Sequence, residues 1–154
     1  GKYEEVIESL KQAIRIDPDD ADAHFNLGVA YYNSDKYEEA IESFKQVIRI
    51  DPDDAKAHYN LGLAYHNLEM YEEAIESYKQ AIKINPDHVN AHYNLGLAYN
   101  NLEMYEEAID SYKQAIKIKP DYREAHNNLG VAEEARKDKI GLWWEKASNF
   151  LKGK

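Results

Sequence analysis

Four histidines recur at a constant interval of 34 residues: His24, His58, His92 and His126. Imidazole is a common metal ligand, so these side chains are the first candidates for a chemical site. With one histidine on each of four helices packed about 10 Å apart, however, the rings cannot meet around one ion. His88 precedes His92 by the spacing of one helical turn, but no third ligand accompanies the pair. We therefore predict no metal and no cofactor, and expect the histidines to pack between helices.

Acidic pairs form the second group with chemical potential, because two carboxylates can act as a general acid and a general base. They recur at the same interval: Glu38–Glu39, Glu72–Glu73 and Glu106–Glu107. Sequence neighbours point apart on a helix, and acids in a first helical turn oppose the positive end of the helix dipole. No phosphate-binding loop, nucleophile elbow or dinucleotide fingerprint is present. We predict that the chain is not an enzyme.

The segments that carry these residues repeat with the same period. AHFNLGVAYY at 23–32 returns as AHYNLGLAYH at 57–66, as AHYNLGLAYN at 91–100 and, weakened, as AHNNLGVAEE at 125–134. A fixed period of this size indicates an array in which each unit covers the apolar face of its neighbour. Such arrays present long surfaces to partners, so the period favours binding over catalysis.

One unit, residues 55–88, illustrates the local structure. Apolar and small residues at spacings of three and four predict two amphipathic helices, here called helix A and helix B, joined by a turn at 67–70. Pro86 ends helix B, and the aspartate that follows it can cap the next helix. Gly62 lies where helix A must approach helix B closely, so a larger side chain there would push the two helices apart.

Composition narrows the class of partner. The formal charge is −10, with 29 acidic against 19 basic residues, and a nucleic acid requires a basic face that most of the chain lacks. The absence of cysteine excludes disulfides and thiol chemistry. No apolar run reaches about 18 residues and no signal peptide opens the chain, so we expect a soluble, cytoplasmic protein without a nucleic-acid partner.

The type unit resembles the tetratricopeptide repeat (TPR) family. Six positions agree with the pattern of that family: Leu61, Gly62, Tyr65, Ala74, Ala81 and Pro86. The resemblance extends over nearly the whole chain and implies an all-α fold, a helical-hairpin repeat solenoid (TPR superhelix). Histidine replaces the large aromatic residue of the family at the fourth position of each unit. The A–B turn has Asp35, Glu69 and Glu103 where the family usually has glycine, so we expect a strained or reshaped turn.

The resemblance also divides the chain. Residues 1–20 match helix B alone and form a half repeat, 21–54, 55–88 and 89–122 are units, and 123–154 is a degenerate fourth unit with a capping C-terminal helix. This organisation implies about four A–B helix pairs plus the N-terminal half repeat, nine helices in all. Because the chain begins in mid-unit without methionine, we expect the native N-terminus to be absent. Without a preceding helix A, the half repeat would leave one apolar face open, and we expect this face to favour self-association. The face consists of Tyr3, Ile7, Leu10 and Ile14.

The fourth unit changes character after Gly130, where the polar run EEARKDK replaces the expected pattern. If the A–B turn is shortened by two residues, four later residues fall into the buried register of helix B: Ile140, Trp144, Ala147 and Phe150. Residues 137–154 also carry five lysines against Asp138 and Glu145, with Trp143 nearby. Such a basic amphipathic helix is also typical of membrane-surface or partner-binding segments. We favour a cap over membrane contact, because the register match is specific and arrays need capped ends.

The resemblance implies that helices A line a concave groove. Four rows of side chains would face it: Phe25, Tyr59 and Tyr93; Val29, Leu63 and Leu97; Tyr32, His66 and Asn100; and Asn26, Asn60, Asn94 and Asn128. None is basic, unlike the lysines and arginines with which family members clamp the C-terminal carboxylate of chaperone tails. The asparagines resemble the amide ladder of the O-linked sugar transferase, which holds an extended peptide by its main chain. Alternatively, they only satisfy hydrogen bonds between repeats.

Three functions remain open from the sequence. We favour a non-enzymatic scaffold that binds an extended or helical segment of another protein in the groove. The second is a self-associating structural or engineered array without a native ligand, and the third is a docking fragment of a larger enzyme. The near identity of units 55–88 and 89–122 is compatible with either recent duplication or engineering.

Overall fold

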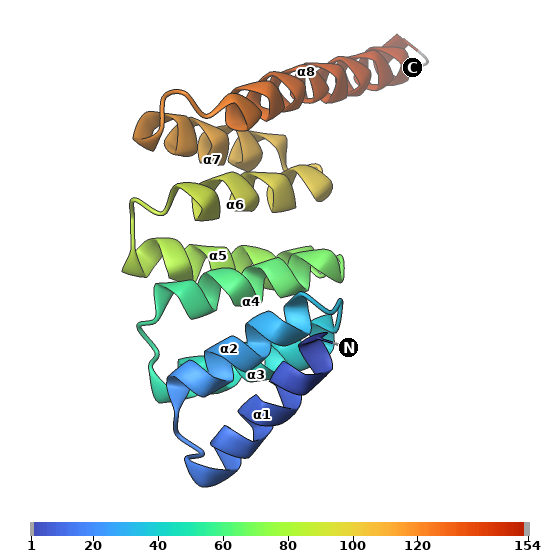
Figure 1. Ribbon diagram of the computed structural model, residues 1–154. Helices are drawn as coiled ribbons and strands as arrows, with labels where there is room; N and C mark the ends of the chain where they lie inside the picture. Colours follow the sequence, from blue (N-terminus) through green and yellow to red (C-terminus); the bar gives the residue numbers. More distant parts are fainter. Residues whose placement is uncertain (1, 153–154) are drawn as a thin grey trace.

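The computed structural model describes residues 2–152; Gly1, which opens the expected half repeat, and residues 153–154, which end the expected fourth unit, lie outside them. The described chain forms eight helices: α1 (Lys2–Ile16), α2 (Ala21–Tyr32), α3 (Tyr37–Ile50), α4 (Ala55–Asn67), α5 (Tyr71–Ile84), α6 (Val89–Asn101), α7 (Tyr105–Ile118) and α8 (Arg123–Lys152). Each helix packs against the next in an elongated stack (Figure 1). The all-α solenoid expected from the sequence is confirmed.

The A helices form one side of this stack. α2 contacts α4 and α4 contacts α6, in addition to the contacts within each hairpin. No comparable contact links α3, α5 and α7 within the part of the chain that the structure describes. Helices that approach each other more closely lie on the inner side of a curved array. The residues predicted to line the groove therefore lie on the closely spaced A helices.

Polar caps set the start of each A helix. The carboxylate of Asp54 accepts hydrogen bonds from the backbone N–H groups of Lys56 at 2.8 Å and Ala57 at 3.0 Å, and Asp20 caps α2 in the same way. At α6 the cap is His88, whose Nδ1 accepts from the N–H of Ala91 at 3.2 Å. The capping residue is thus the second residue after each proline. The sequence had predicted the residue directly after the proline, and that prediction is wrong.

The turn inside each hairpin requires a left-handed residue. Asp35, Glu69 and Glu103 have φ angles of 58°, 58° and 55°. After α4, the N–H of Glu69 donates to the carbonyl of His66 at 3.0 Å, and the N–H of Met70 donates to the carbonyl of Tyr65 at 3.0 Å. These two bonds form a Schellman motif, whose left-handed position favours glycine. The expected strain is therefore present, because a side chain with a Cβ atom occupies this position.

Each hairpin closes around a glycine. A Cβ atom built on Gly62 would lie 2.5 Å from Cε1 of Tyr78, and Gly96 meets Tyr112 at the same distance. In the first hairpin the corresponding ring is Phe44, 2.6 Å from a Cβ built on Gly28. The three rings are fully buried. The close A–B approach predicted at Gly62 is confirmed, and it recurs in all three hairpins.

The fourth unit differs from the expectation. The predicted turn and second helix are absent: residues 123–152 form the single helix α8, so the described chain has eight helices and not nine. A Cβ atom on Gly130 would meet nothing within 4 Å, because no helix B packs against it. Of the residues expected in the buried register, Ile140, Trp144 and Phe150 are exposed and Ala147 is half-buried.

Local sequence explains why α8 continues. Residues 133–137 are all good helix formers. Two residues before the left-handed position, the three hairpins that do turn have an asparagine, a weaker helix former, where the fourth unit has Ala135: Asn33, Asn67 and Asn101. Arg136 also pairs with Glu106 at 3.0 Å, and Lys139 donates to the backbone carbonyl of Glu103 at 3.1 Å. These contacts hold the helix straight along α7. The first half of α8 therefore covers α7, and Trp144 is not part of a buried second helix.

The half repeat at the N-terminus also differs in one respect. Ile7 is buried, and Leu10 and Ile14 pack against the same apolar cluster as Leu27 of α2. Of the four residues expected on an open face, only Tyr3 is exposed. The apolar side of α1 is thus used mainly against α2.

We predict opposite effects of alanine at two helical glycines. Gly62→Ala should destabilise the protein by about 1–3 kcal/mol, because the methyl group displaces the buried ring of Tyr78. Gly130→Ala should stabilise it by up to about 1 kcal/mol, because alanine favours the helix and meets nothing. Thermal and urea unfolding measure both. Equal effects of the two substitutions would contradict the close-packing role of Gly62.

We also predict that glycine relieves the turns. Glu69→Gly or Glu103→Gly should each add up to about 1 kcal/mol, because the left-handed penalty exceeds the extra entropy of unfolded glycine. The control Glu76→Gly, in the middle of α5, should cost about 1 kcal/mol. If urea unfolding shows that all three destabilise the protein alike, the turns are not strained.

Candidate functional site

The first two predicted rows lie on α2, α4 and α6 as half-buried side chains: Phe25, Tyr59, Tyr93, Val29, Leu63 and Leu97. Each aromatic ring of the first row is supported from behind by the ring that closes its own hairpin. The Tyr59 and Tyr78 ring centroids are 6.0 Å apart, and Phe25 lies 5.7 Å from Phe44. A second ring flanks Tyr59 at 4.6 Å, that of His88. Packing on two sides fixes the orientation of the first row.

Asparagine and tyrosine form bonds between neighbouring hairpins. The Nδ2 group of Asn94 donates to Tyr59 Oη at 3.0 Å and to the carbonyl of Asn90 at 2.9 Å. Asn128 Nδ2 donates to Tyr93 Oη at 2.9 Å. Each hydroxyl accepts this bond and keeps its own hydrogen to donate, while the Oδ1 atoms of Asn94 and Asn128 have no donor among residues 2–152. The result is two similar pairs, each with a hydroxyl donor and an amide acceptor, although only Asn94 also bonds a carbonyl of its own helix within the described residues.

The first two asparagines of the row behave differently. Asn60 donates only to the carbonyl of Lys56, at 2.8 Å. The residue that would accept its second hydrogen is Phe25, which has no hydroxyl group. Asn26 is exposed and forms no bond to another repeat within the described chain. The row is therefore uniform in sequence but not in hydrogen bonding, and only its second half has the paired arrangement.

The third row offers little polar surface. Tyr32 Oη accepts a bond from Asn67 Nδ2 at 2.9 Å. His66 Nδ1 and Asn100 Oδ1 are buried and have no hydrogen-bond partner within the described residues. Burial lowers the pKa of His66, so its ring is neutral at physiological pH. The structure thus places these three residues at the expected positions but directs the polar atoms of His66 and Asn100 inward.

The electrostatic character of these rows is neutral. Burial raises the pKa of Tyr59 to about 12, and burial also raises the pKa of Tyr93. Both hydroxyl groups therefore remain protonated donors at any physiological pH. No lysine or arginine belongs to the four rows. The site can exchange neutral hydrogen bonds and bury apolar side chains, but it does not supply a cation to an acidic ligand.

The N-terminal end of the rows contains a cavity that the sequence did not suggest. It measures about 380 Å³ and is lined by Lys2, Tyr3, Val6 and Leu10 of α1 beside Asn26 and Val29 of α2. The half repeat thus adds a mainly apolar wall to the groove, with Lys2 as its one basic residue. The sequence predicted only helices A in the groove.

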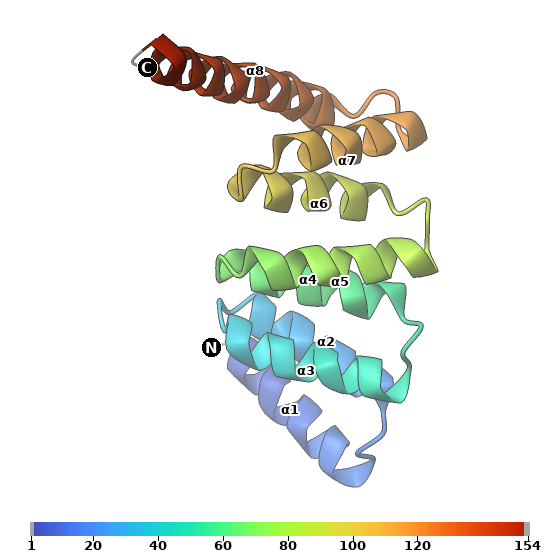
Figure 2. The same ribbon diagram turned by 180° about the vertical axis from the view of Figure 1, so that it is seen from behind.

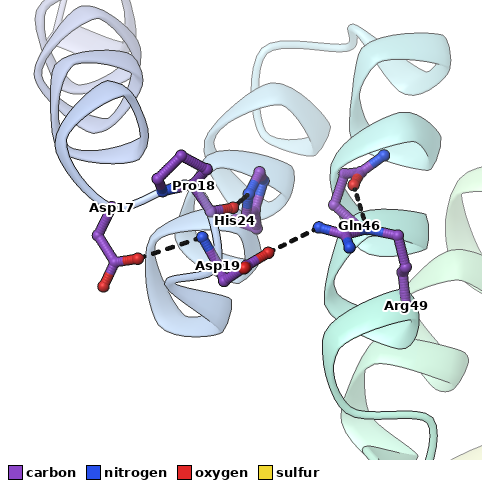
Figure 3. Close-up of polar contacts among 6 residues, drawn as sticks. All are labelled: Asp17, Pro18, Asp19, His24, Gln46 and Arg49. Atoms are coloured by element: carbon purple, nitrogen blue, oxygen red, sulfur yellow. Dashed lines mark hydrogen bonds and ion pairs between the residues drawn. The ribbon is translucent and has the colours of Figure 1, made fainter.

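The recurring histidines have a structural role. The Nε2 atom of His24 lies 2.9 Å from the carbonyl oxygen of Pro18, and Figure 3 shows this contact beside the Arg49–Asp19 ion pair. The three later histidines bond the preceding proline in the same way, at 2.8–2.9 Å: His58, His92 and His126. Each imidazole therefore anchors the connection between two hairpins, which agrees with the expected packing role.

Comparison with known families assigns the array. A model described as tetratricopeptide repeat matches residues 55–88 and 89–122, and a second, described as TPR repeat, matches 1–35 and 34–69. Together the matches cover most of the chain. The chain belongs to the tetratricopeptide repeat family. The TPR recognition made from the sequence is confirmed. The chain is accordingly a protein-interaction domain of a non-catalytic family.

Solved structures agree with this assignment. The crystal structure of MamA is 30% identical, with a TM-score of 0.86 over 97% of this chain and 88% of that one. The first TPR of Spaghetti (RPAP3), bound to the HSP90 peptide SRMEEVD, is 27% identical, with a TM-score of 0.73 over 75% of this chain and 91% of that one. The second TPR domain of human RPAP3, in complex with the HSP70 peptide SGPTIEEVD, is 26% identical, with a TM-score of 0.70 over 71% and 92%.

No curated protein sequence matches the chain significantly. None of the eight described helices has both the length and the apolar character needed to cross a bilayer.

We predict that the hydroxyl groups behind the first row are dispensable. Tyr78 and Tyr112 Oη are buried without a hydrogen-bond partner in residues 2–152, and Phe44 already occupies the equivalent position in α3. Tyr78→Phe and Tyr112→Phe should leave stability unchanged or raise it by about 1 kcal/mol each, because an unpaired buried hydroxyl is removed. Urea unfolding measures the change. A loss above about 1 kcal/mol would mean that these hydroxyl groups do have partners.

Proposed function

We propose that this TPR domain binds an extended, apolar peptide segment of another protein along α2, α4, α6 and the start of α8. The observation that supports it is the pair of matched bonds, Asn94 to Tyr59 and Asn128 to Tyr93. Each pair presents an acceptor oxygen and a donor hydroxyl side by side. A peptide main chain has the complementary N–H and C=O groups at every residue, so it can bind both without reference to its sequence.

The spacing of the pairs fits an extended ligand. Neighbouring A helices lie about 10 Å apart and an extended chain rises roughly 3.3 Å per residue, so one pair meets about every third residue. In this arrangement Asn94 accepts from the peptide and Tyr59 donates to it. The amide of Asn94 only accepts a bond from the peptide, because both of its hydrogens are already donated within the protein.

The neighbouring rows define the preferred side chains. Leu63 and Leu97 flank the aromatic row and favour apolar residues of the ligand. The HSP90 and HSP70 peptides of the RPAP3 complexes, SRMEEVD and SGPTIEEVD, end in acidic residues. The rows proposed here contain no lysine or arginine to neutralise such an end. We therefore place the ligand in a different class: neutral, apolar, and bound without a free C-terminal carboxylate.

Two other uses of the array stay predictions. Self-association through the N-terminal half repeat would use Tyr3 and Val6, which are exposed on α1. The chain would also serve as the docking fragment of a larger enzyme, because the same groove would hold the substrate protein.

We predict that binding depends on the tyrosine hydroxyl groups. Tyr59→Phe combined with Tyr93→Phe removes two donors and should weaken binding about tenfold, at roughly 0.5–1.5 kcal/mol per hydrogen bond. The probes are unstructured, leucine- and valine-rich peptides with blocked termini, titrated by calorimetry. Backbone N-methylation of every third residue should weaken binding similarly, because it removes the N–H that Asn94 accepts. Raising the salt concentration should have little effect.

The matched control is Tyr65→Phe with Tyr99→Phe. These tyrosines lie on α4 and α6, like Tyr59 and Tyr93, but they belong to none of the four rows and their rings lie under Lys45 and Lys79 of the preceding helices. The control should bind like the parent. If the Tyr59/Tyr93 variant retains full affinity while folded, or if its loss of affinity only follows a lower melting temperature, the hydrogen bonds serve the repeats alone.

A further inference from the structure

The C-terminal part of α8 projects beyond the stack. Arg136 and Lys139 make the last polar contacts of this helix with α7 and the α6–α7 turn. Residues 140–152, here called the α8 tail, continue as helix past the start of α7, and both views show this projection (Figures 1 and 2). Thirteen residues of helix extend about 20 Å. The tail is thus an ordered element that this hairpin stack does not cover.

The tail has an apolar stripe on the side that α8 turns toward α7. Ala125 and Ala132 are fully buried against α7. At helical spacings of three and four, this face continues through residues 136 and 139 to Trp143 and Ala147. Ile140, Trp143, Trp144 and Leu151 border or lie on the stripe, and they are 48%, 61%, 63% and 71% exposed. The buried face of α8 therefore continues into a stripe of large exposed side chains.

We propose that this stripe pairs with the same stripe of a second copy of the chain, so that two α8 tails cross antiparallel and form a two-fold dimer. An isologous contact requires a surface that is complementary to itself. A single apolar helix face meets this requirement, because it covers its own symmetry mate when the mate runs in the opposite direction.

The area of the stripe is sufficient. Two tryptophans and two aliphatic residues at these exposures leave on the order of 500 Å² of apolar surface per copy, the size of the largest patch that monomers usually expose. Pairing buries this area on both copies, about 1,000 Å² in total, which reaches the lower bound for a specific interface. The exposed apolar area is thus as large as monomers usually leave in water, and two such areas are large enough to form a specific interface.

Charge is compatible with a second copy at the tail. Lys146 and Lys152 lie beside and behind the stripe, so pairing leaves them in water. Each chain carries a net charge of −10, so two copies repel each other as a whole, but the tail itself is basic. The second copy offers carboxylates near its own tail, at Glu107 and at Glu106, which also pairs with Arg136. The area of the stripe, and not the net charge, therefore favours a second copy.

The crossing point is defined by Ala147. It is the small residue at the centre of the stripe, with Trp143 and Leu151 at equal distances on either side, so an antiparallel pair brings each tryptophan onto the leucine of the other copy. Lys152 then lies opposite Leu142 of the second copy. That leucine is about two helical turns from the Arg136–Glu106 contact of its own chain. A small side chain at the crossing allows the two helices to approach closely.

The absence of native cysteine permits a direct test of this geometry. Ala147→Cys should form a disulfide-linked dimer under mild oxidation, because residues on the two-fold axis face their own symmetry mates within disulfide reach. Ile140→Cys should not, because the two copies of that position lie about 20 Å apart. Non-reducing electrophoresis separates the outcomes. Equal cross-linking at both positions, or none at position 147, would overturn the antiparallel pair.

Sedimentation equilibrium tests the interface without cross-linking. The parent should have twice the chain mass at high concentration. Ala147→Glu should weaken dimerisation by at least about tenfold, because it places an unpaired carboxylate at the crossing. Asn149→Glu adds the same charge to the opposite face of the tail and should dimerise like the parent. A monomeric parent, or equal losses in both variants, would overturn the proposal.

Vesicle binding tests the other occupant. Co-sedimentation with vesicles of phosphatidylcholine and phosphatidylserine should recover none of the parent at physiological ionic strength. If the parent binds these vesicles and Ala147→Glu abolishes this binding while the protein in solution is monomeric, the stripe is a membrane anchor and the dimer is rejected. All these variants lie outside the four rows, so peptide binding should be unchanged.

Discussion

The contact between an aromatic ring and a helical glycine sets the geometry of the array. Where Gly62 meets Tyr78, the two helices of a hairpin are close enough that a methyl group would overlap the ring. This approach buries the ring completely and places it 6.0 Å from the ring of the first-row residue Tyr59. The position of Tyr59 then fixes where its hydroxyl meets Asn94 of the next hairpin. The groove is therefore a consequence of how each hairpin closes.

Most of the fold follows from the 34-residue period, because the period shows which positions share an environment. Gly62 was predicted to lie at the close approach of helices A and B, and Gly28 and Gly96, its equivalents in the period, lie against a buried ring in the same way. The period gives a wrong prediction where the apolar spacing of a unit is kept but the helices that surround it are different. Residues 137–152 keep the spacing of a buried helix B, yet α8 does not turn, because residues 133–137 are all strong helix formers and Ala135 replaces the asparagine found before each of the other turns. Apolar spacing predicts a helical face but not what covers it.

The candidate site was predictable as a set of positions but not as a set of bonds. The row of asparagines has one member per unit, whereas the bonds join residues 35 apart, such as Tyr59 and Asn94. A comparison of units in register does not reveal a partner that lies one residue out of register in the next unit. The missing bond of Asn60 likewise depends on Phe25, which counts as equivalent to tyrosine when only aromatic character is compared. The histidine–proline contacts escaped notice for a similar reason, since one partner is a backbone atom.

The Asn–Tyr bonds also make the groove responsive to the shape of the whole solenoid. Tyr59 and Asn94 belong to different hairpins, so winding or unwinding the superhelix changes the distance between the two atoms that would bind a ligand. A change in the pitch of the superhelix would therefore change the spacing at which peptide residues can bind. A ligand of the right repeat length would act as a brace along the inner edge, and stretching the array would release that ligand. A repeat protein built in this way would act as a spring whose stiffness depends on its occupancy.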